Sequence, residues 1–172
     1  GYGLMMLVMT ATPLSMIVCG FEFNDSAFVI QWHAFFMFAP GFITGHLIKR
    51  FGMTAIIMTG AFLALISMAV SLSGITLMHF WTGLVLMGVG WNFMFVGGTS
   101  LLTETYAPQE RAKVQAFNDT MVFGTTAIAS FGSGALLSWL GWNAVNLTVA
   151  APAILLLIAA FVLRMKRHAT TS

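Results

Sequence analysis

The sequence is a succession of six apolar runs, each long enough to cross a lipid bilayer as a helix. They lie at about 3–20, 26–48, 53–73, 76–104, 114–140 and 144–164, with short polar breaks between them. A membrane-spanning helix needs about 20 mainly apolar residues, and the strands of a membrane barrel alternate in polarity, which these runs do not. We therefore predict an all-α integral membrane protein, a six-transmembrane-helix bundle with short connections.

The composition excludes a soluble globule. Only 7% of the residues are charged and 59% are hydrophobic, whereas a soluble domain carries about 25% charged residues. Such a chain cannot cover a surface that faces water, so the lipid bilayer is its first expected partner. The few cations are not gathered into one patch, and we expect no nucleic-acid partner.

All cations of the chain lie after the second, fourth and sixth runs. These seven residues are Lys49, Arg50, Arg111, Lys113, Arg164, Lys166 and Arg167. The loops after the first, third and fifth runs hold no Lys or Arg. Because cytoplasmic loops hold the excess of Lys and Arg, we predict a multi-pass protein of the plasma (inner) membrane with both ends of this chain in the cytoplasm.

Two short motifs accompany these loops. Gly45, Leu47, Arg50 and Gly52 form G-x-L-x-x-R-x-G in the loop after the second run, and the stretch YAPQERAKVQAFND follows the fourth run. The first motif resembles the loop motif between the second and third helices of each half of the major facilitator superfamily. The second is similar to the P-x-E-R-[GA] segment between the fourth and fifth helices of a half.

The resemblance covers the whole chain and implies a particular place in the family's fold. It implies that residues 1–172 are the C-terminal six-helix half of a bacterial-type transporter, whose N-terminal half is absent from this sequence and is a further expected partner. Lys49 stands where the family has an acidic residue, and Met53 and Thr54 replace its trailing basic pair. This degenerate form is typical of the C-terminal half.

Polar residues inside the runs supply the candidate binding and coupling residues. They must face protein or a water-filled cavity, because unsatisfied polar groups are costly in hydrocarbon. In the fifth run, Gln115, Asp119, Thr126 and Ser130 are spaced to share one helical face. The remaining candidates are Asn118 beside that stripe, Asn92 in the fourth run, and Gln31 and His33 in the second. The runs 53–73 and 144–164 carry few polar residues and are of the lipid-facing type.

Each candidate has a structural alternative that the sequence leaves open. Asp119 is either a cavity or gating residue or a partner of a neighbouring helix, and His33 is either a proton carrier or a satisfied interhelical histidine. The five glycines of the fourth run, Gly83, Gly88, Gly90, Gly97 and Gly98, indicate either close packing or bending. Pro13 and Pro40 permit kinks in the first two runs.

A second group of candidates lies at the predicted cytoplasmic rim. Gly41 and Gly45 form a GxxxG pair, which favours close helix packing, and Lys49, Arg50 and Gly52 follow it. Glu104, Glu110 and Arg111 flank the loop after the fourth run. Ion pairing at the rim and a gate latch are both open for this second set.

The function predicted from these features is secondary active transport of a small molecule by alternating access, coupled to protons. Alternatives are a non-transporting membrane subunit or a channel. An intramembrane serine protease would need a base near a nucleophile such as Ser133, and no histidine occurs in the last two runs, so we predict no enzyme. We expect no cofactor and no metal, because no metal-ligand spacing connects the four histidines.

Overall fold

The helix α5, Leu77–Thr103, is the element around which the others are arranged. It packs most extensively against α4, Met53–Ser73, and also against α2, Phe23–Phe38. The computed structural model describes residues 1–169 and the side chains of residues 1–167. Among these residues every regular element is a helix, which confirms the predicted all-α class.

Close approach of α5 to its neighbours depends on glycine. A Cβ atom added at Gly90 would lie 2.8 Å from the carbonyl oxygen of Gly60 in α4, and one at Gly60 would lie 2.6 Å from that of Gly90. A Cβ at Gly88 would lie 2.9 Å from the carbonyl oxygen of His33 in α2. The glycines of α5 therefore serve close packing, except Gly98, where an added Cβ would meet nothing within 4 Å.

The second apolar run, expected as one helix over 26–48, is divided in two. The helix α2 ends at Phe38, and α3, Gly41–Phe51, continues at an angle of 42° to it. Pro40 lies at the break and has no N–H to continue the ladder. Pro13, in contrast, lies inside the continuous helix α1, Tyr2–Val18.

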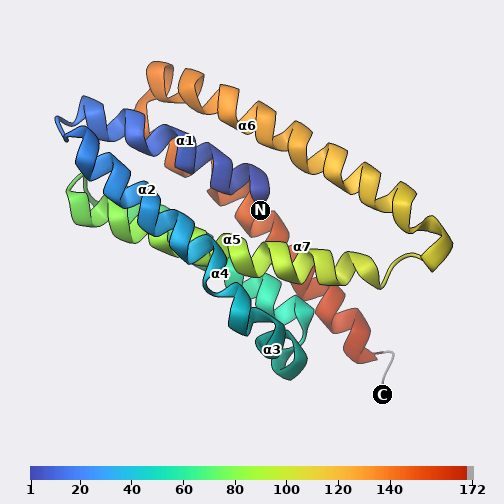
Figure 1. Cartoon of the computed structure of the whole chain (residues 1–172). Helices are drawn as coiled ribbons and strands as arrows, with labels where there is room; N and C mark the ends of the chain where they lie inside the picture. The colour runs from blue at the N-terminus through green and yellow to red at the C-terminus, as the bar shows by residue number, and fades with distance from the viewer. Residues whose placement is uncertain (170–172) are drawn as a thin grey trace.

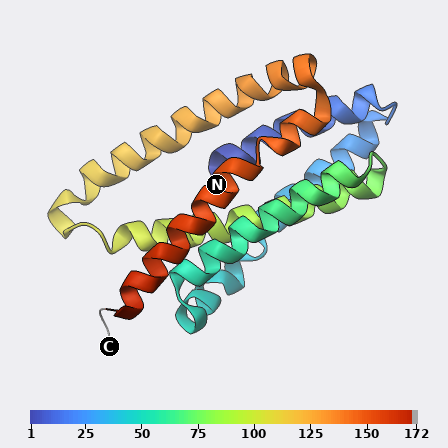
Figure 2. The ribbon, with the colours of Figure 1, turned by 180° about the vertical axis from the view of Figure 1, so that it is seen from behind.

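The last two runs are joined by a turn at Gly141. The element α6, Arg111–Leu147, consists of two helical parts that meet in a kink at Gly141, whose φ of 78° is a left-handed conformation that favours glycine. The chain reverses its direction there and continues into α7, Ala150–Ala169 (Figures 1 and 2). The sequence predicts the boundary between these two runs at 140–144.

The helices form two layers. The helices α1, α2 and α5 lie toward the viewer in Figure 1, whereas α4 and α7 lie behind them and come to the front in Figure 2. The rear pair, α4 and α7, are in contact with each other. These two helices contain the runs that the sequence marks as lipid-facing.

Length and composition identify fewer spans than the six predicted. Three described helical segments are long and apolar enough to cross a membrane, or four if the bent pair α2 and α3 is one span. One of the three, Pro108–Arg167, has 60 residues and contains the reversal at Gly141. The helix α1 is apolar but has only 17 residues. The count of six spans therefore stays a prediction.

Candidate functional site

The break between α2 and α3 is held by Asn92 of α5. Its Nδ2 donates to the carbonyl oxygen of Met37, and its Oδ1 accepts a hydrogen bond from Thr44 Oγ1, both at 2.7 Å. Asn92 and Thr44 are buried, with 4% and 0% of their surface exposed. Asn92 thus uses both ends of its amide to join the two halves of the bent pair.

His33 lies in the interface between α2 and α5. The ring is fully buried, and its Nδ1 is 2.7 Å from the carbonyl oxygen of Leu84. A carbonyl only accepts, so Nδ1 carries the proton of this hydrogen bond. Nε2 is buried with no hydrogen-bond partner among the described residues. The ring therefore connects α2 to α5 through Nδ1, while Nε2 makes no hydrogen bond with the described residues.

The polar residues of α6 are spread along a helix that makes few contacts at its start. Gln115 Nε2 donates to the Tyr106 hydroxyl at 2.8 Å, and Asn118 Nδ2 donates to the exposed Asp119 at 3.3 Å. Thr126 and Ser130 are half-buried, and Thr126 donates to the carbonyl oxygen of Val122 in its own helix. Asp119 is about 12 Å along α6 from Arg111, at 1.5 Å per residue.

Gln31 lies on the opposite side of α2 from His33, in a hollow with three aromatic rings. This aromatic hollow has a volume of about 380 Å³ and is lined by Phe28, Gln31, Trp32 and Phe35. All four side chains are exposed. Gln31 is the single polar member of the lining.

The rim candidates occupy the ends of helices. Lys49 and Arg50 are exposed in the last turn of α3, and the Arg50 guanidinium lies 5.2 Å from the centre of the Phe51 ring. Gly52, with a φ of 86°, ends α3 and lets α4 begin at the next residue. Within the described chain the GxxxG pair makes no close approach, because a Cβ at Gly45 would meet nothing within 4 Å and one at Gly41 would meet only Asn92 Nδ2, at 3.5 Å.

The acidic rim residues Glu104 and Glu110 do not pair with the nearby Arg111. Glu104, at the end of α5, pairs with Arg167 of α7 at 2.8 Å. Glu110 accepts a hydrogen bond at 3.4 Å from the backbone N–H of Ala107 and so closes the short 3-10 helix Pro108–Glu110. Arg111 is exposed and begins α6.

The ends of α3, α5 and α7 lie together toward one end of the molecule, and the turns that follow α1 and α4 lie at the other (Figure 1).

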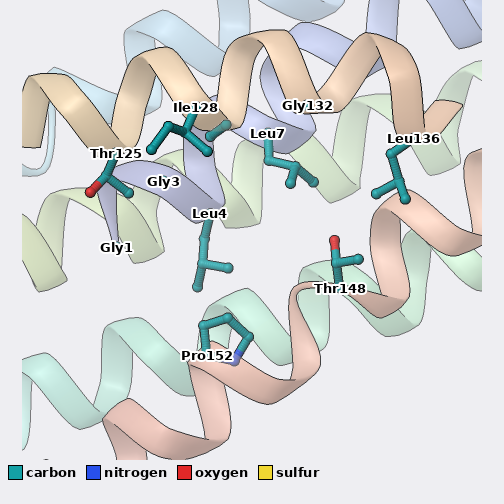
Figure 3. A pocket seen from close by; sticks show the side chains of 11 residues that line it. Gly1, Gly3, Leu4, Leu7, Thr125, Ile128, Gly132, Leu136, Thr148 and Pro152 are labelled. Carbon is teal, nitrogen blue, oxygen red and sulfur yellow. The ribbon is translucent and has the colours of Figure 1, made fainter.

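One cavity contains none of the candidates. It measures about 490 Å³ and lies where α1, α6 and α7 meet, with Leu4, Leu7, Ile128 and Leu136 on its walls (Figure 3). Thr125 and Thr148 are the polar side chains that line it. Ser133, weighed above as a nucleophile, is buried near this cavity and donates to the carbonyl oxygen of Leu7 at 2.8 Å. No group of three potential metal ligands occurs in the described part of the chain.

The model of the Major Facilitator Superfamily matches residues 1–172, which is the whole chain. The chain belongs to the major facilitator superfamily. This confirms the resemblance that the loop motifs indicated. The chain is therefore a multi-pass membrane protein of a family of transporters and not of enzymes. No solved structure matches the chain significantly.

Three curated members of the superfamily match most of this chain. The riboflavin transporter RfnT of Brucella anthropi is 44% identical over 96% of the chain, which covers 41% of that transporter. The uncharacterized MFS-type transporters YddS and YdeG of Bacillus subtilis are 31% and 30% identical over 90% and 83% of the chain, which covers 36% and 34% of their lengths. The chain thus spans less than half of each relative.

Within this superfamily chain, the predicted candidates do not meet in one cluster. His33 and Asn92 are in the contact of α2 with α5, Gln31 is on the exposed side of α2, and Asp119 is on α6. The candidates predicted from the sequence include neither Thr44, which bonds Asn92, nor Trp32, which lines the aromatic hollow. Thr44 carries no distinguishing signal in the sequence, but Trp32 has one, because Phe28, Trp32 and Phe35 are spaced to share a helical face.

Proposed function

We propose that the longer protein to which this chain belongs is a secondary transporter that moves a small molecule by alternating access, with this chain as its C-terminal six-helix half. The observation that carries the proposal is the 44% identity to a riboflavin transporter over 96% of the chain. We propose the same substrate class, a flavin, for this protein. All seven cations lie at helix ends, which suits an uncharged substrate of this kind.

The exposed polar residues support a second half that covers them. Gln31 on α2 and Asp119 on α6 are exposed in this unit. Polar side chains within a membrane face a bundle interior or a water-filled cavity. These faces of α2 and α6 therefore suit contact with the N-terminal half or with the substrate path between the halves.

Proton coupling is the finer part of the proposal, and Asp119 is its carrier. It is the single carboxylate that lies more than two turns from the start of a described helix and away from that helix's end. Glu104 and Glu110 are at helix ends, and Asp25 is in the first turn of α2. A carboxylate at this position is able to bind and release a proton as the cavity opens to each side.

We propose the plasma (inner) membrane as the location, with the cation-bearing ends of α3 and α7 and the start of α6 in the cytoplasm. The clustering of these ends at one side of the bundle supports this orientation. The alternatives predict different outcomes. A channel would pass the solute down its own gradient without need of a proton gradient, and a non-transporting subunit would give no flux.

Uptake of riboflavin by the full-length protein in proteoliposomes tests the proposal. We expect uptake that a proton gradient stimulates and a protonophore abolishes. Asp119→Asn should lose gradient-driven uptake but keep counterflow exchange. Asp25→Asn is the matched control, because its amide oxygen still accepts the hydrogen bond from the backbone N–H of Glu22. Uncoupled flux at channel rates would contradict transport by alternating access. Full coupling in Asp119→Asn would contradict the role of Asp119 as the proton carrier.

A further inference from the structure

The aromatic hollow on α2 has the features of a ligand site. Phe28, Trp32 and Phe35 are separated by four and three residues and so share a face of the helix. They are 42%, 38% and 55% exposed. A volume of about 380 Å³ lies within the range of about 300–1,000 Å³ that small-molecule sites have.

Trp32 is held in place by rings on both helices. It stacks on Phe36 with centroids 6.0 Å apart and an interplanar angle of 29°, and it makes an edge contact with Trp81 of α5 at 6.3 Å. Phe28 and Phe35 make edge contacts with it at 6.3 and 5.6 Å. A ring fixed in this way loses little freedom when a ligand stacks on it, which favours binding.

The position of Gln31 indicates that this face of α2 is not turned toward lipid. It lies about 12 Å along α2 from Phe23, at 1.5 Å per residue, and its side chain is exposed beside the three rings. A primary amide at that depth has no hydrogen-bond partner in hydrocarbon, so it must face protein or an aqueous cavity. The rings that share the hollow with Gln31 face the same space.

We propose that the aromatic hollow recognises the tricyclic ring of a flavin, with Trp32 stacked on the ring and Gln31 paired with the edge of its pyrimidine portion. A carboxamide donates and accepts, which complements an imide that offers one N–H beside a carbonyl oxygen. None of the four lining residues is charged, which suits a neutral ring. This inference rests on the proposed function and adds to it the residues that select the substrate.

Binding of ring compounds to the full-length protein tests the assignment. The probes are riboflavin, lumichrome, which keeps the tricyclic ring without the ribityl chain, and ribitol, which keeps only the chain. We expect riboflavin and lumichrome to bind with quenching of flavin fluorescence, and ribitol not to compete. Trp32→Ala should raise the Kd of both ring compounds by on the order of tenfold to a hundredfold, the range found for stacking on an aromatic side chain.

Two further variants separate recognition from folding. Trp32→Phe keeps an aromatic face and should restore binding to within a few-fold of the wild type. Trp139→Ala removes another exposed tryptophan, which is 82% exposed on α6, and should leave the Kd unchanged. Gln31→Leu should weaken lumichrome by about tenfold but should not further weaken an analogue methylated at the imide nitrogen, since that analogue has already lost the hydrogen bond.

The outcomes distinguish this inference from the proposed function. If the wild type takes up riboflavin but Trp32→Ala and Gln31→Leu bind it normally, the hollow is not the ring site although transport stands. If Trp32→Ala lowers the melting temperature of the ligand-free protein without changing the Kd, Trp32 serves helix packing alone, and the inference fails. If the wild type binds neither ring compound, the flavin assignment fails, while protonophore-sensitive uptake of other solutes would still support a transporter.

Discussion

Thr44 of α3 donates a hydrogen bond of 2.7 Å to Asn92 of α5, and both side chains are buried. The same amide bonds the carbonyl oxygen of Met37 on the other side of the break at Pro40. The bend of 42° between α2 and α3 is therefore fixed from outside by a third helix rather than by proline alone. This contact determines the direction in which α3 carries Lys49 and Arg50.

We expect Thr44→Val to lower the free energy of unfolding by about 1–2 kcal/mol, because it leaves Asn92 Oδ1 buried without its donor. Thr59→Val is the matched control, since exposed Thr59 bonds only the carbonyl oxygen of Ala55 in its own helix, at 3.0 Å. Unfolding of the full-length protein in detergent, followed by circular dichroism, measures both. Equal losses for the two variants would show that the contact does not stabilise the bend.

The crossing of α4 and α5 gives a second prediction. Gly60→Ala places a Cβ 2.6 Å from the carbonyl oxygen of Gly90, so the two helices must separate, and we expect a loss of about 1–3 kcal/mol. Gly98→Ala makes the same change in α5 where nothing lies within 4 Å, and it should be neutral or slightly stabilising. The melting temperatures of the two variants in the same detergent measure this difference in stability. A neutral Gly60→Ala would mean that the helices have room to separate.

The sequence predicted the elements better than the contacts between them. Apolar runs and their breaks located the helices because burial in lipid demands about 20 apolar residues wherever a span occurs. The division at Pro40 was foreseen only as a possible kink, since whether proline bends a helix depends on what packs beside it. Asn92 was identified as a polar residue within a span, but its partners Thr44 and Met37 lie 48 and 55 residues away, and no local pattern connects them.

Charges at the rim show the same limit. Ion pairing at the rim was one of two possibilities for Glu104 that the sequence left open, but the sequence did not indicate Arg167, 63 residues away, as the partner. The pair forms because α5 and α7 both end at the same side of the bundle (Figure 1). A pairing of this kind depends on the order and on the lengths of the helices. The sequence predicts the order, but it predicts the lengths only to within a turn.

The Glu104–Arg167 pair should contribute little to stability. Its side chains are 49% and 45% exposed, and ion pairs of that kind are typically worth about 0–1 kcal/mol. We expect Glu104→Gln to change the free energy of unfolding by less than about 1 kcal/mol and the effect to vanish at high salt. If the pair is also a gate latch, Glu104→Gln will alter the uptake rate, and the double exchange Glu104→Arg with Arg167→Glu will restore it. An unchanged rate would leave the pair a rim contact alone.

The orientation of the bundle is testable through a residue that the chain already carries. Cys19 is exposed just after α1, and Lys49 is in the last turn of α3. The turn that follows α1 and the end of α3 lie at opposite ends of the bundle (Figure 1). If the cation-rich ends are cytoplasmic, Cys19 faces outward, because the loop that follows α1 contains no Lys or Arg. In a full-length protein whose other cysteines are replaced, a membrane-impermeant maleimide should label Cys19 in intact cells. Lys49→Cys in a Cys19→Ser background should react only after permeabilisation, and Arg111→Cys should behave in the same way. Labelling of Lys49→Cys in intact cells would invert the proposed topology without affecting the packing of α5, since the contacts of that helix do not depend on which side of the membrane each end faces.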